Sequence, residues 1–393
     1  MKNDCRMPTA DAIRRTVTAL AIATLLAGVA EAGPREQARR MHDRIAGVPP
    51  DSTVLAAMEA DIAAGRAGDA ANRAMEHPSF YSVTLKNLAT PWTNRDQTVF
   101  APLNDYTATF IGMVRDDLPM NELLSADLLY VGRSGLGLPA VSSASNAHYE
   151  EMDRRHIDLK ANLERRVQSA TYGVPAEAAA GVMTTRAAAQ AFFVAGTNRA
   201  MFRFTLLNQL CTELEEINDT SRPVDRIRQD ISRSPGGDSR LFLNNCVGCH
   251  AGMDPMAQAF AYYDYDDAQG RLVYTAGAVR PKYSINADTF RTGFVTPDDS
   301  WINYWRNGPN ALLGWSPSLP GSGAGARSLG VELGNTEAFA SCQVEKVFRA
   351  VCLRPTNNSA DRARVGAMVS SFRSGGYRLK GVFADTAAYC MGQ

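Results

Sequence analysis

The clearest chemistry in the sequence lies in a run of five residues, Cys-Val-Gly-Cys-His, at positions 246–250. Two cysteines separated by two residues, with a histidine directly after the second, are the attachment signature of c-type haem. On a helical turn the thiols of Cys246 and Cys249 face the same side and can add to the two vinyl groups of one porphyrin. The imidazole of His250 then lies beneath the ring and can bind the iron. The sequence therefore predicts one covalently attached haem c, held by Cys246, Cys249 and the metal-binding His250.

Two other interpretations of this run are weaker. A Cys-x-x-Cys pair can be a dithiol/disulfide redox centre, but no βαβ pattern surrounds it as in a thioredoxin-like site. A structural zinc ion needs about four ligands at suitable spacings. The chain has neither a second Cys-x-x-Cys nor a His-x3–5-His pair. Haem is therefore favoured over both.

The residues directly after the motif indicate what surrounds the histidine. Pro255 has no backbone N–H and pushes the residue before it away from helix, so we expect the chain to turn soon after His250. A backbone carbonyl in that turn could accept the second ring N–H of His250 and orient the imidazole. Met253 and Met256 follow too closely to reach the far face of the ring, so we expect them to pack in the haem pocket.

The sequence leaves the ligand on the far face of the iron open. Methionine and histidine are the usual choices. Met368, on a predicted helix, is the distal candidate, although a core methionine is the commoner role for such a residue. His148, His156 and Met183 are alternatives. A vacant sixth position is a further alternative, and it would favour catalysis over simple electron transfer.

The N-terminus has the three parts of a secretory signal peptide. Basic residues within positions 1–15 precede an apolar run at 16–30, and Ala-Glu-Ala at 30–32 provides a cleavage site. The apolar run is shorter than the roughly 20 residues of a spanning helix. We therefore expect residues 1–32 to be removed and the mature protein to be periplasmic or secreted, with no membrane span. Export agrees with haem c, which is attached outside the cytoplasm.

Charge and length limit the partners and the number of domains. Lys plus Arg equals Asp plus Glu at 41 each, so the formal net charge is zero. No polybasic tract indicates a nucleic-acid partner. The mature length of about 360 residues allows one large domain or two to three small ones. We expect a redox partner protein, whose identity the sequence does not indicate.

The remaining cysteines predict two disulfides. Cys5 leaves with the signal peptide, and four cysteines remain outside the haem motif, at positions 211, 342, 352 and 390. An even number in an oxidising compartment favours two disulfides. Cys342 and Cys352 lie ten residues apart on a predicted helix, hence about 15 Å along its axis, whereas a disulfide needs Cα atoms within roughly 4.4–6.8 Å. The preferred pairing is 211–342 with 352–390, and the alternative is 211–352 with 342–390.

The fold class predicted from the pattern of apolar residues is mainly α. One predicted helix has its N-cap at Asp51 or Ser52, and another carries Val344, Val347, Phe348 and Val351 on one face. A small β-hairpin is expected at 272–285, and the Gly-rich stretch 321–325 within 308–334 is expected to be loop. The predicted helices cover 34–46, 52–75, 98–118, 121–130, 149–169, 184–217 with a break near 196–198, 223–231, 336–354, 361–372 and 380–390.

Four stretches of the chain share motifs with one known family. They are Leu-Leu-Ser-Ala-Asp at 123–127 followed by Leu-Tyr-Val at 129–131; Gly-Val-Met-Thr at 181–184 with Thr-Asn-Arg at 197–199; the haem segment with Asp-Pro at 254–255 and Gly-Arg at 270–271; and Phe-Ala-Ser-Cys at 339–342 with Gly-Tyr-Arg-Leu at 376–379. In this order they resemble the cytochrome-c-like domains of unknown function that occur in tandem in planctomycete-type secreted haem proteins. Ala261 departs from the family's usual glutamate.

The resemblance implies a helical, exported, single-haem protein and no particular reaction. Cys352 and Cys390 look like additions to the family pattern, which favours their pairing with each other. We therefore expect an N-terminal helical region at 33–180 and a cytochrome-c-like haem domain at 181–393.

The leading functional hypothesis is electron transfer by a periplasmic monohaem c-type cytochrome. One alternative is a haem oxidoreductase, peroxidase-like or serving as a partner subunit of a dehydrogenase. Another is a scaffold or binding protein that haem stabilises. No set of paired acids, Ser-His-Asp triad or phosphate-binding loop assigns catalytic residues, so the sequence does not decide whether the protein is an enzyme.

Overall fold

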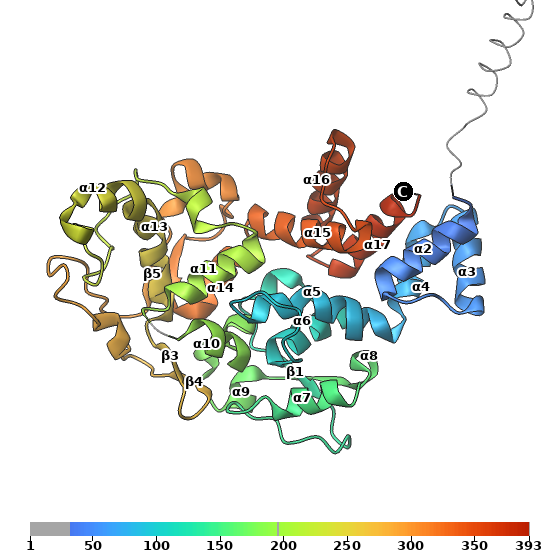
Figure 1. Cartoon of the computed structure of the whole chain (residues 1–393), viewed down its shortest axis with the longest axis horizontal. Helices are drawn as coiled ribbons and strands as arrows, with labels where there is room; N and C mark the ends of the chain where they lie inside the picture. The colour runs from blue at the N-terminus through green and yellow to red at the C-terminus, as the bar shows by residue number, and fades with distance from the viewer. Residues whose placement is uncertain (1–31, 195, 393) are drawn as a thin grey trace, which may run out of the picture.

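The structure, a computed structural model, describes residues 32–194 and 196–392 and is mainly helical (Figure 1). Three two-stranded antiparallel sheets lie among the helices of this part of the chain. The predicted mainly helical class is confirmed. The predicted signal peptide lies outside the described residues except for Ala32.

The N-terminal helices form one end of the molecule. They are α2 (Pro34–Ala46), α3 (Ser52–Ala63) and α4 (Ala67–Met75), which pack on one another. The Asp51 carboxylate caps α3 by accepting hydrogen bonds from the backbone N–H groups of Thr53 and Val54, as the sequence predicted. The single helix predicted over 52–75 is divided in two because Gly65 adopts a left-handed conformation, with φ at 76°.

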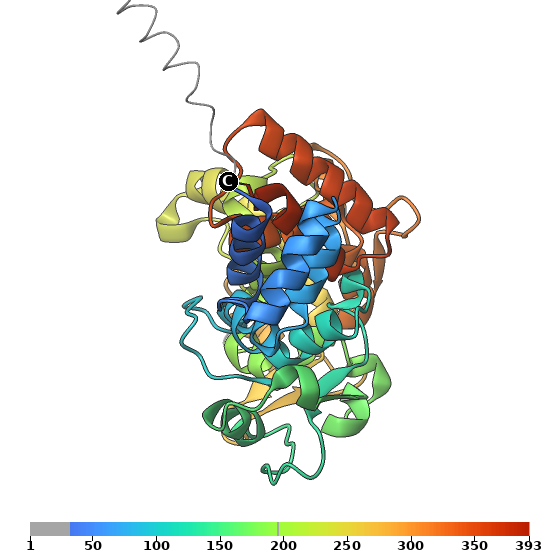
Figure 2. The same ribbon diagram turned by 90° about the vertical axis from the view of Figure 1, so that its right-hand side faces the viewer.

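The C-terminal helices lie beside this N-terminal group. α15 (Glu337–Cys352), α16 (Ser359–Ser374) and α17 (Leu379–Cys390) pack together, and α17 also contacts α2 and α4. Figure 2 shows the N-terminal helices in front, with C-terminal helices beside and above them. The two ends of the described chain therefore meet on one side of the molecule.

The middle of the chain joins these helices to the haem-motif region. It begins with a π-helical turn, η1 (Phe80–Leu85). Its central helix is α6 (Asp105–Arg115), in which residues 105–114 are all buried. The other elements of this part are α5 (Lys86–Ala89), η2 (Thr90–Thr93), η3 (Met120–Glu122), β1 (Leu129–Gly132), α7 (Ala147–Arg154), α8 (Leu159–Asn162), β2 (Leu163–Arg166), α9 (Gln168–Tyr172) and η4 (Ala176–Ala178).

The remaining elements build the region around the haem motif, at the left of Figure 1. Most of them are short and are joined by long irregular segments. They are η5 (Gly181–Thr184), α10 (Arg186–Phe192), α11 (Arg199–Thr205), η6 (Leu206–Leu210), η7 (Leu214–Ile217), η8 (Pro235–Gly237), α12 (Ser239–Leu241), η9 (Phe242–Cys246), α13 (Val247–Ala257), η10 (Gln258–Phe260), β3 (Tyr263–Asp266), β4 (Arg271–Tyr274), η11 (Pro281–Ser284), β5 (Ser300–Ile302), η12 (Tyr304–Arg306), η13 (Pro309–Leu313), β6 (Ser322–Ala324) and α14 (Gly325–Gly334).

Two predicted helices are wrong where strands form instead. The predicted helix over 121–130 is a 3-10 turn followed by β1, and the predicted helix over 149–169 becomes α7, α8, β2 and the start of α9. β1 and β2 pair antiparallel, with Leu129 opposite Arg166 and Gly132 opposite Leu163. Short apolar runs fit either a helix or a strand, so the distant partner decides between them.

Three further expectations about local structure are also wrong. The predicted helix over 223–231 is irregular, because its backbone instead meets the segment at 290–294 through Phe290 N–H to Gln229 O and Phe294 N–H to Ile227 O. The hairpin expected at 272–285 lies earlier, as β3 and β4, with Tyr263 opposite Tyr274. The stretch 321–325 contains β6, which pairs with β5 and runs directly into α14, because backbone pairing does not need large side chains.

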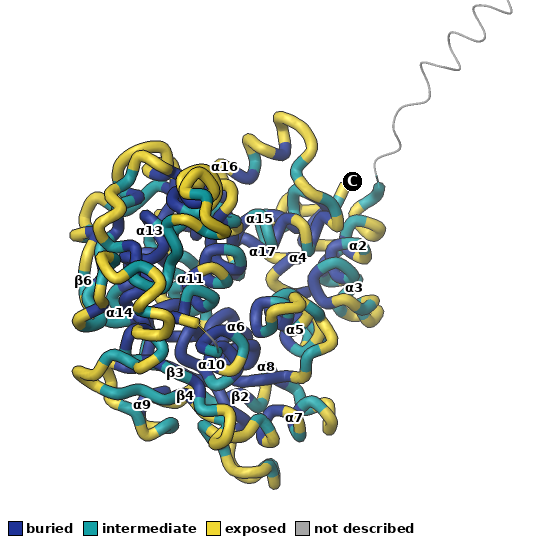
Figure 3. Tube along the Cα trace, turned by 60° about the vertical axis from the view of Figure 1, so that its left-hand side comes forward, coloured by how far each residue is buried: buried dark blue, intermediate teal, exposed yellow. Residues whose placement is uncertain are grey.

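Buried segments occur throughout the described chain (Figure 3). The main hydrophobic cluster runs from Ala38 to Cys390. This cluster includes residues on both sides of the domain boundary predicted between residues 180 and 181. The division into two domains stays a prediction. A small second cluster lies under the haem motif, formed by Ile227, Phe242, Val247 and Ala251. Within the described residues, none of the helices combines the length and the apolar character needed to cross a bilayer.

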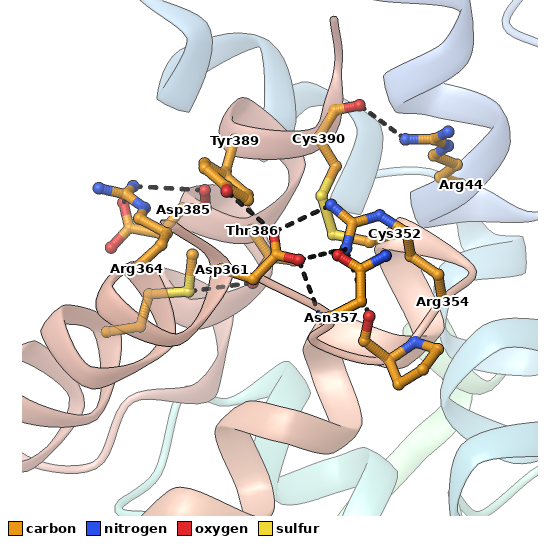
Figure 4. Close-up of a disulfide and its surroundings, with 12 residues drawn as sticks. Arg44, Cys352, Arg354, Asn357, Asp361, Arg364, Asp385, Thr386, Tyr389 and Cys390 are labelled. Atoms are coloured by element: carbon orange, nitrogen blue, oxygen red, sulfur yellow. Dashed lines mark hydrogen bonds and ion pairs between the residues drawn. A yellow bond between two sulfur atoms is a disulfide. The ribbon is translucent and has the colours of Figure 1, made fainter. Parts of the chain in front are cut away.

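The two disulfides have the preferred pairing. Cys211 pairs with Cys342 at a Cα–Cα distance of 5.3 Å, and Cys352 pairs with Cys390 at 5.6 Å (Figure 4). α15 is continuous between Cys342 and Cys352, so these two cannot pair with each other. The first disulfide joins the region of α11 to the C-terminal helices, and the second lies within the C-terminal helices.

Candidate haem-attachment site

The Cys-x-x-Cys-His run lies at the start of α13. It is entered through the π-helical turn η9, in which the backbone N–H of Val247 donates to the carbonyl of Phe242. π-helical turns inside helices are common at functional sites. Cys246 and Cys249 are both free thiols that keep part of their surface exposed, and the His250 side chain is 19 % exposed. The three predicted attachment residues are therefore brought together on one accessible turn.

The opposite face of α13 is closed. Gly248 and Gly252 lie one turn apart, against Asn218 and Trp305, and neither position has room for a Cβ atom. Trp305 is fully buried. α13 therefore packs against the protein through its glycine face. The other face, which carries the two thiols and the imidazole, is the one that could receive a ligand.

The thiols differ in their surroundings. The Cys249 Sγ donates a hydrogen bond of 3.3 Å to the backbone carbonyl of Leu214. Burial raises the pKa of the Cys249 thiol above its ordinary value. Leu241 and Leu243, just before the motif, are exposed apolar side chains. The chain directly before Cys246 therefore carries apolar side chains at the surface.

The imidazole of His250 is oriented by a carboxylate. Its Nδ1 lies 3.0 Å from Oδ1 of Asp254, four residues later on the same helix. The expected turn at Pro255 is wrong, because α13 continues through the proline to Ala257. The continued helix brings residue 254 beneath residue 250, so the partner is a side chain and not the expected backbone carbonyl. The i, i+4 spacing of His250 and Asp254 was the signal in the sequence.

Asp254 is fully buried and is paired with Arg199, the first residue of α11. The Arg199 guanidinium donates from Nε to Oδ1 at 2.7 Å and from Nη2 to Oδ2 at 3.1 Å. Burial alone would raise the pKa of Asp254, but the positive charge of Arg199, aided by His250 and Arg228, holds this pKa well below its ordinary value. The carboxylate facing His250 is therefore ionised.

The same guanidinium binds a second carboxylate. Arg199 donates to Asp230 from Nη1 at 2.7 Å and from Nη2 at 3.0 Å. Arg228 is also buried, and its guanidinium carbon lies 4.7 Å from the centre of the Tyr283 ring. The sequence did not predict roles for Arg199, Arg228 or Asp230. The Thr-Asn-Arg motif at 197–199 was the nearest signal, and Asn198 secures it by donating to the carbonyls of Phe260 and Tyr263.

The structure does not bring Met368 to the motif. Met368 is 1 % exposed on α16, and the Thr386 hydroxyl of α17 lies 3.4 Å from its sulfur. α16 packs mainly on α15 and α17, whereas α13 packs on α11, β5, η7 and η12, in another part of the molecule (Figure 1). Met253 and Met256 are buried in the main hydrophobic cluster.

Of the alternative distal ligands, His148 is engaged elsewhere. Both ring nitrogens of His148 have partners, the Pro139 carbonyl at 2.7 Å and the Gly132 backbone N–H at 2.9 Å. His156 follows the end of α7, and Met183 is buried in η5. A cavity of about 1020 Å³ lies beside His148, lined mainly by residues 131–141 and 165–171. Its lining does not include the haem motif.

In comparisons with known proteins, no family model, no curated protein and no solved structure matches the chain. The resemblance to cytochrome-c-like domains therefore stays a prediction that rests on the quoted motifs. The candidate site is defined by its own residues: two thiols, one imidazole and the carboxylate–arginine pair behind it.

Proposed function

We propose that the protein is an exported monohaem c-type cytochrome-like protein that exchanges electrons with a redox partner protein. Cys246 and Cys249 attach the haem, and His250 is its protein ligand. Bound haem supplies an iron that accepts and releases one electron. The observation that carries the proposal is the contact of His250 Nδ1 with Asp254, because a proton held on Nδ1 leaves Nε2 free to act as a ligand.

Attachment through the two thiols requires no oxidant. Cys246 and Cys249 would hold the group through two thioether bonds, because each thiol would give its sulfur to one carbon of a vinyl group and its hydrogen to the other carbon. Free, partly exposed thiols support this reaction, as do the exposed leucines that precede them. The side chains that are present thus fit the group.

The two disulfides support a location outside the cytoplasm. Disulfides persist in oxidising compartments and are rare in the cytosol. Attachment of haem c takes place in the same compartments, so the thiol chemistry of Cys211, Cys342, Cys352 and Cys390 agrees with that proposed for the motif.

The test is to express the full chain with its signal peptide in a host that matures c-type cytochromes. We expect the purified protein to have a pyridine haemochrome band of c type and to keep its haem after acid-acetone extraction. The matched control is C246A/C249A, which should fold and lose all covalent haem. Purification of a haem-free wild-type chain from a host that matures another c-type cytochrome would refute the proposal.

A second candidate is a haem oxidoreductase of the peroxidase-like class. The observation that favours it is the carboxylate behind His250, because an electron-rich imidazole stabilises oxidised iron. Optical spectroscopy separates the candidates. A high-spin ferric spectrum would support the oxidoreductase, and a far-red methionine–iron charge-transfer band would support the electron carrier.

A further inference from the structure

We propose that Asp254, held in place by Arg199, is a positioning residue for His250 and lowers the reduction potential of the haem. The inference rests on the proposed function and concerns the same site. It assigns to this chain a ligand with a carboxylate partner, in place of the backbone carbonyl expected from the sequence.

The carboxylate has little freedom to move. Oδ1 of Asp254 faces both His250 Nδ1 and Arg199 Nε, and Oδ2 faces Arg199 Nη2 and the backbone N–H of Arg228, at 3.4 Å. The side chain is fully buried, so water does not compete for these contacts. Arg199 donates hydrogen bonds to both carboxylate oxygens of Asp254. Rotation of the carboxylate away from His250 would therefore break several charge-assisted hydrogen bonds.

This geometry determines which nitrogen of His250 carries the proton. An ionised carboxylate only accepts hydrogen bonds, so the neutral His250 ring donates from Nδ1, and its Nε2 keeps the lone pair. The ring is then held with Nε2 turned away from Asp254. Neutral histidine in water prefers the proton on Nε2, so Asp254 selects the tautomer that can bind a metal through Nε2.

The charge on the acceptor affects the iron. An anionic acceptor draws the Nδ1 proton more strongly than a neutral carbonyl does, which makes Nε2 a stronger donor. A stronger donor stabilises the ferric state over the ferrous state and lowers the reduction potential.

Asp230 provides a matched control. It accepts two hydrogen bonds from the same Arg199, and its side chain is 9 % exposed. Its carboxylate pairs with Arg199 and Arg228, and not with His250. Asp254→Asn and Asp230→Asn each remove one negative charge beside Arg199, but only the first changes the acceptor of His250.

The experiment is a redox titration of haem-loaded wild type, Asp254→Asn and Asp230→Asn, followed optically. At a fixed applied potential we expect Asp254→Asn to lower the ferric-to-ferrous ratio at least about tenfold, equivalent to about 59 mV for one electron. Asp230→Asn should change the ratio less than half as much on the logarithmic scale, and Asp254→Glu should restore part of the wild-type value. Equal shifts in the two asparagine variants would overturn the proposal.

A second measurement needs no haem and no change at Asp254. In the full chain carrying C246S/C249S, ¹⁵N shifts of labelled histidine rings should place the His250 proton on Nδ1, with the signal identified by its loss in H250Q. A neutral His250 ring with its proton on Nε2 instead of Nδ1 would overturn the proposal. Absence of haem from the wild type would instead refute the proposed function and leave this tautomer measurement valid.

Discussion

Two buried aspartates, Asp254 on α13 and Asp361 on α16, form the same kind of ion pair but have different roles. Each is fully buried and forms an ion pair with one arginine, Arg199 for Asp254 and Arg354 for Asp361. Arg354 donates to the two oxygens of Asp361 at 2.5 and 3.0 Å. The two carboxylates therefore differ mainly in their other partners.

The other partners of Asp361 are structural. Its carboxylate accepts from the backbone N–H of Asn357 at 3.1 Å and from the Tyr389 hydroxyl at 2.9 Å (Figure 4). These contacts join the start of α16 to the loop before it and to α17, beside the Cys352–Cys390 disulfide. At Asp254 the corresponding partner is an imidazole with a second nitrogen available. The pair at Asp254 differs from the pair at Asp361 because it holds a partly exposed imidazole whose second nitrogen could bind a ligand.

The largest expected effect concerns the Cys211–Cys342 disulfide, which joins the region of α11, where Arg199 lies, to the C-terminal helices, where Asp361 lies. Cys211–Cys342 closes a loop of 131 residues and Cys352–Cys390 one of 38. Loop-closure entropy predicts losses of about 5 kcal/mol for C211A/C342A and about 4 kcal/mol for C352A/C390A. Urea unfolding of the two double variants and the wild type measures the difference. A larger loss in C352A/C390A would mean that the C-terminal helices depend on their own disulfide more than on the link between the regions.

The next effect tests the two aspartates directly. Asp254→Ala leaves the buried Arg199 with only Asp230 as a partner, and should cost about 3–5 kcal/mol of unfolding free energy. It should also change the haem spectrum and potential. Asp361→Ala should destabilise the protein and leave both optical properties as in the wild type. A spectral change in Asp361→Ala would remove the proposed distinction between the two sites.

A variant of Met368 tests whether the C-terminal helices have only a structural role or also provide a ligand to the haem. Because its side chain is buried between α16 and α17, Met368→Ala should leave a cavity and cost about 2–5 kcal/mol. The spectrum of the haem-loaded protein should not change. Loss of a far-red charge-transfer band in this variant would instead identify Met368 as the distal ligand.

The smallest expected effect is a dependence on pH. Hydrogen bonds from Arg354 hold the pKa of Asp361 well below its ordinary value, which is about 3.9 in an unfolded chain. A lowered pKa in the folded state contributes stability that is fully present above the unfolded value and is lost as the pH falls through the folded value. The deficit of Asp361→Asn relative to the wild type should therefore be constant from neutral pH to about pH 5 and shrink below about pH 4.

The control for this pH series is Asp385→Asn. Asp385 is 51 % exposed and lies 3.8 Å from Arg364, also between α16 and α17. An exposed pair of this kind contributes at most about 1 kcal/mol. A deficit of Asp361→Asn that stays constant down to pH 2 would contradict the assigned role of the carboxylate.

Features that depend on near neighbours could be predicted from the sequence. The apolar face of 344–351 predicted the core of α15, and Asp51 predicted a helix cap. The rise of a helix over ten residues excluded a disulfide between Cys342 and Cys352. The spacing of Cys246, Cys249 and His250 predicted that they share one turn. Each of these inferences uses only the geometry of a single helix.

The strands and the partner of His250 could not be predicted in the same way. Residues 129–132 form a strand because residues 163–166 pair with them, and 263–266 because 271–274 do. Pro255 was expected to end the helix, yet α13 continues because its closed face packs on Trp305 and its carboxylate is held by Arg199. Contacts from outside the segment outweighed the local preference of the proline.

The sequence by itself determined the chemistry that this protein carries: two thiols and an imidazole at the spacing of a haem anchor, four cysteines for two disulfides, and a chain of mainly helical character. Only the tertiary structure decided what stands behind the imidazole. Arg199 and Asp254 lie 55 residues apart in the chain, and Arg199 and Asp230 lie 31 apart. Local spacing specifies which groups share a turn, but the burial that makes one carboxylate a fixed partner comes from segments that meet only when the chain folds.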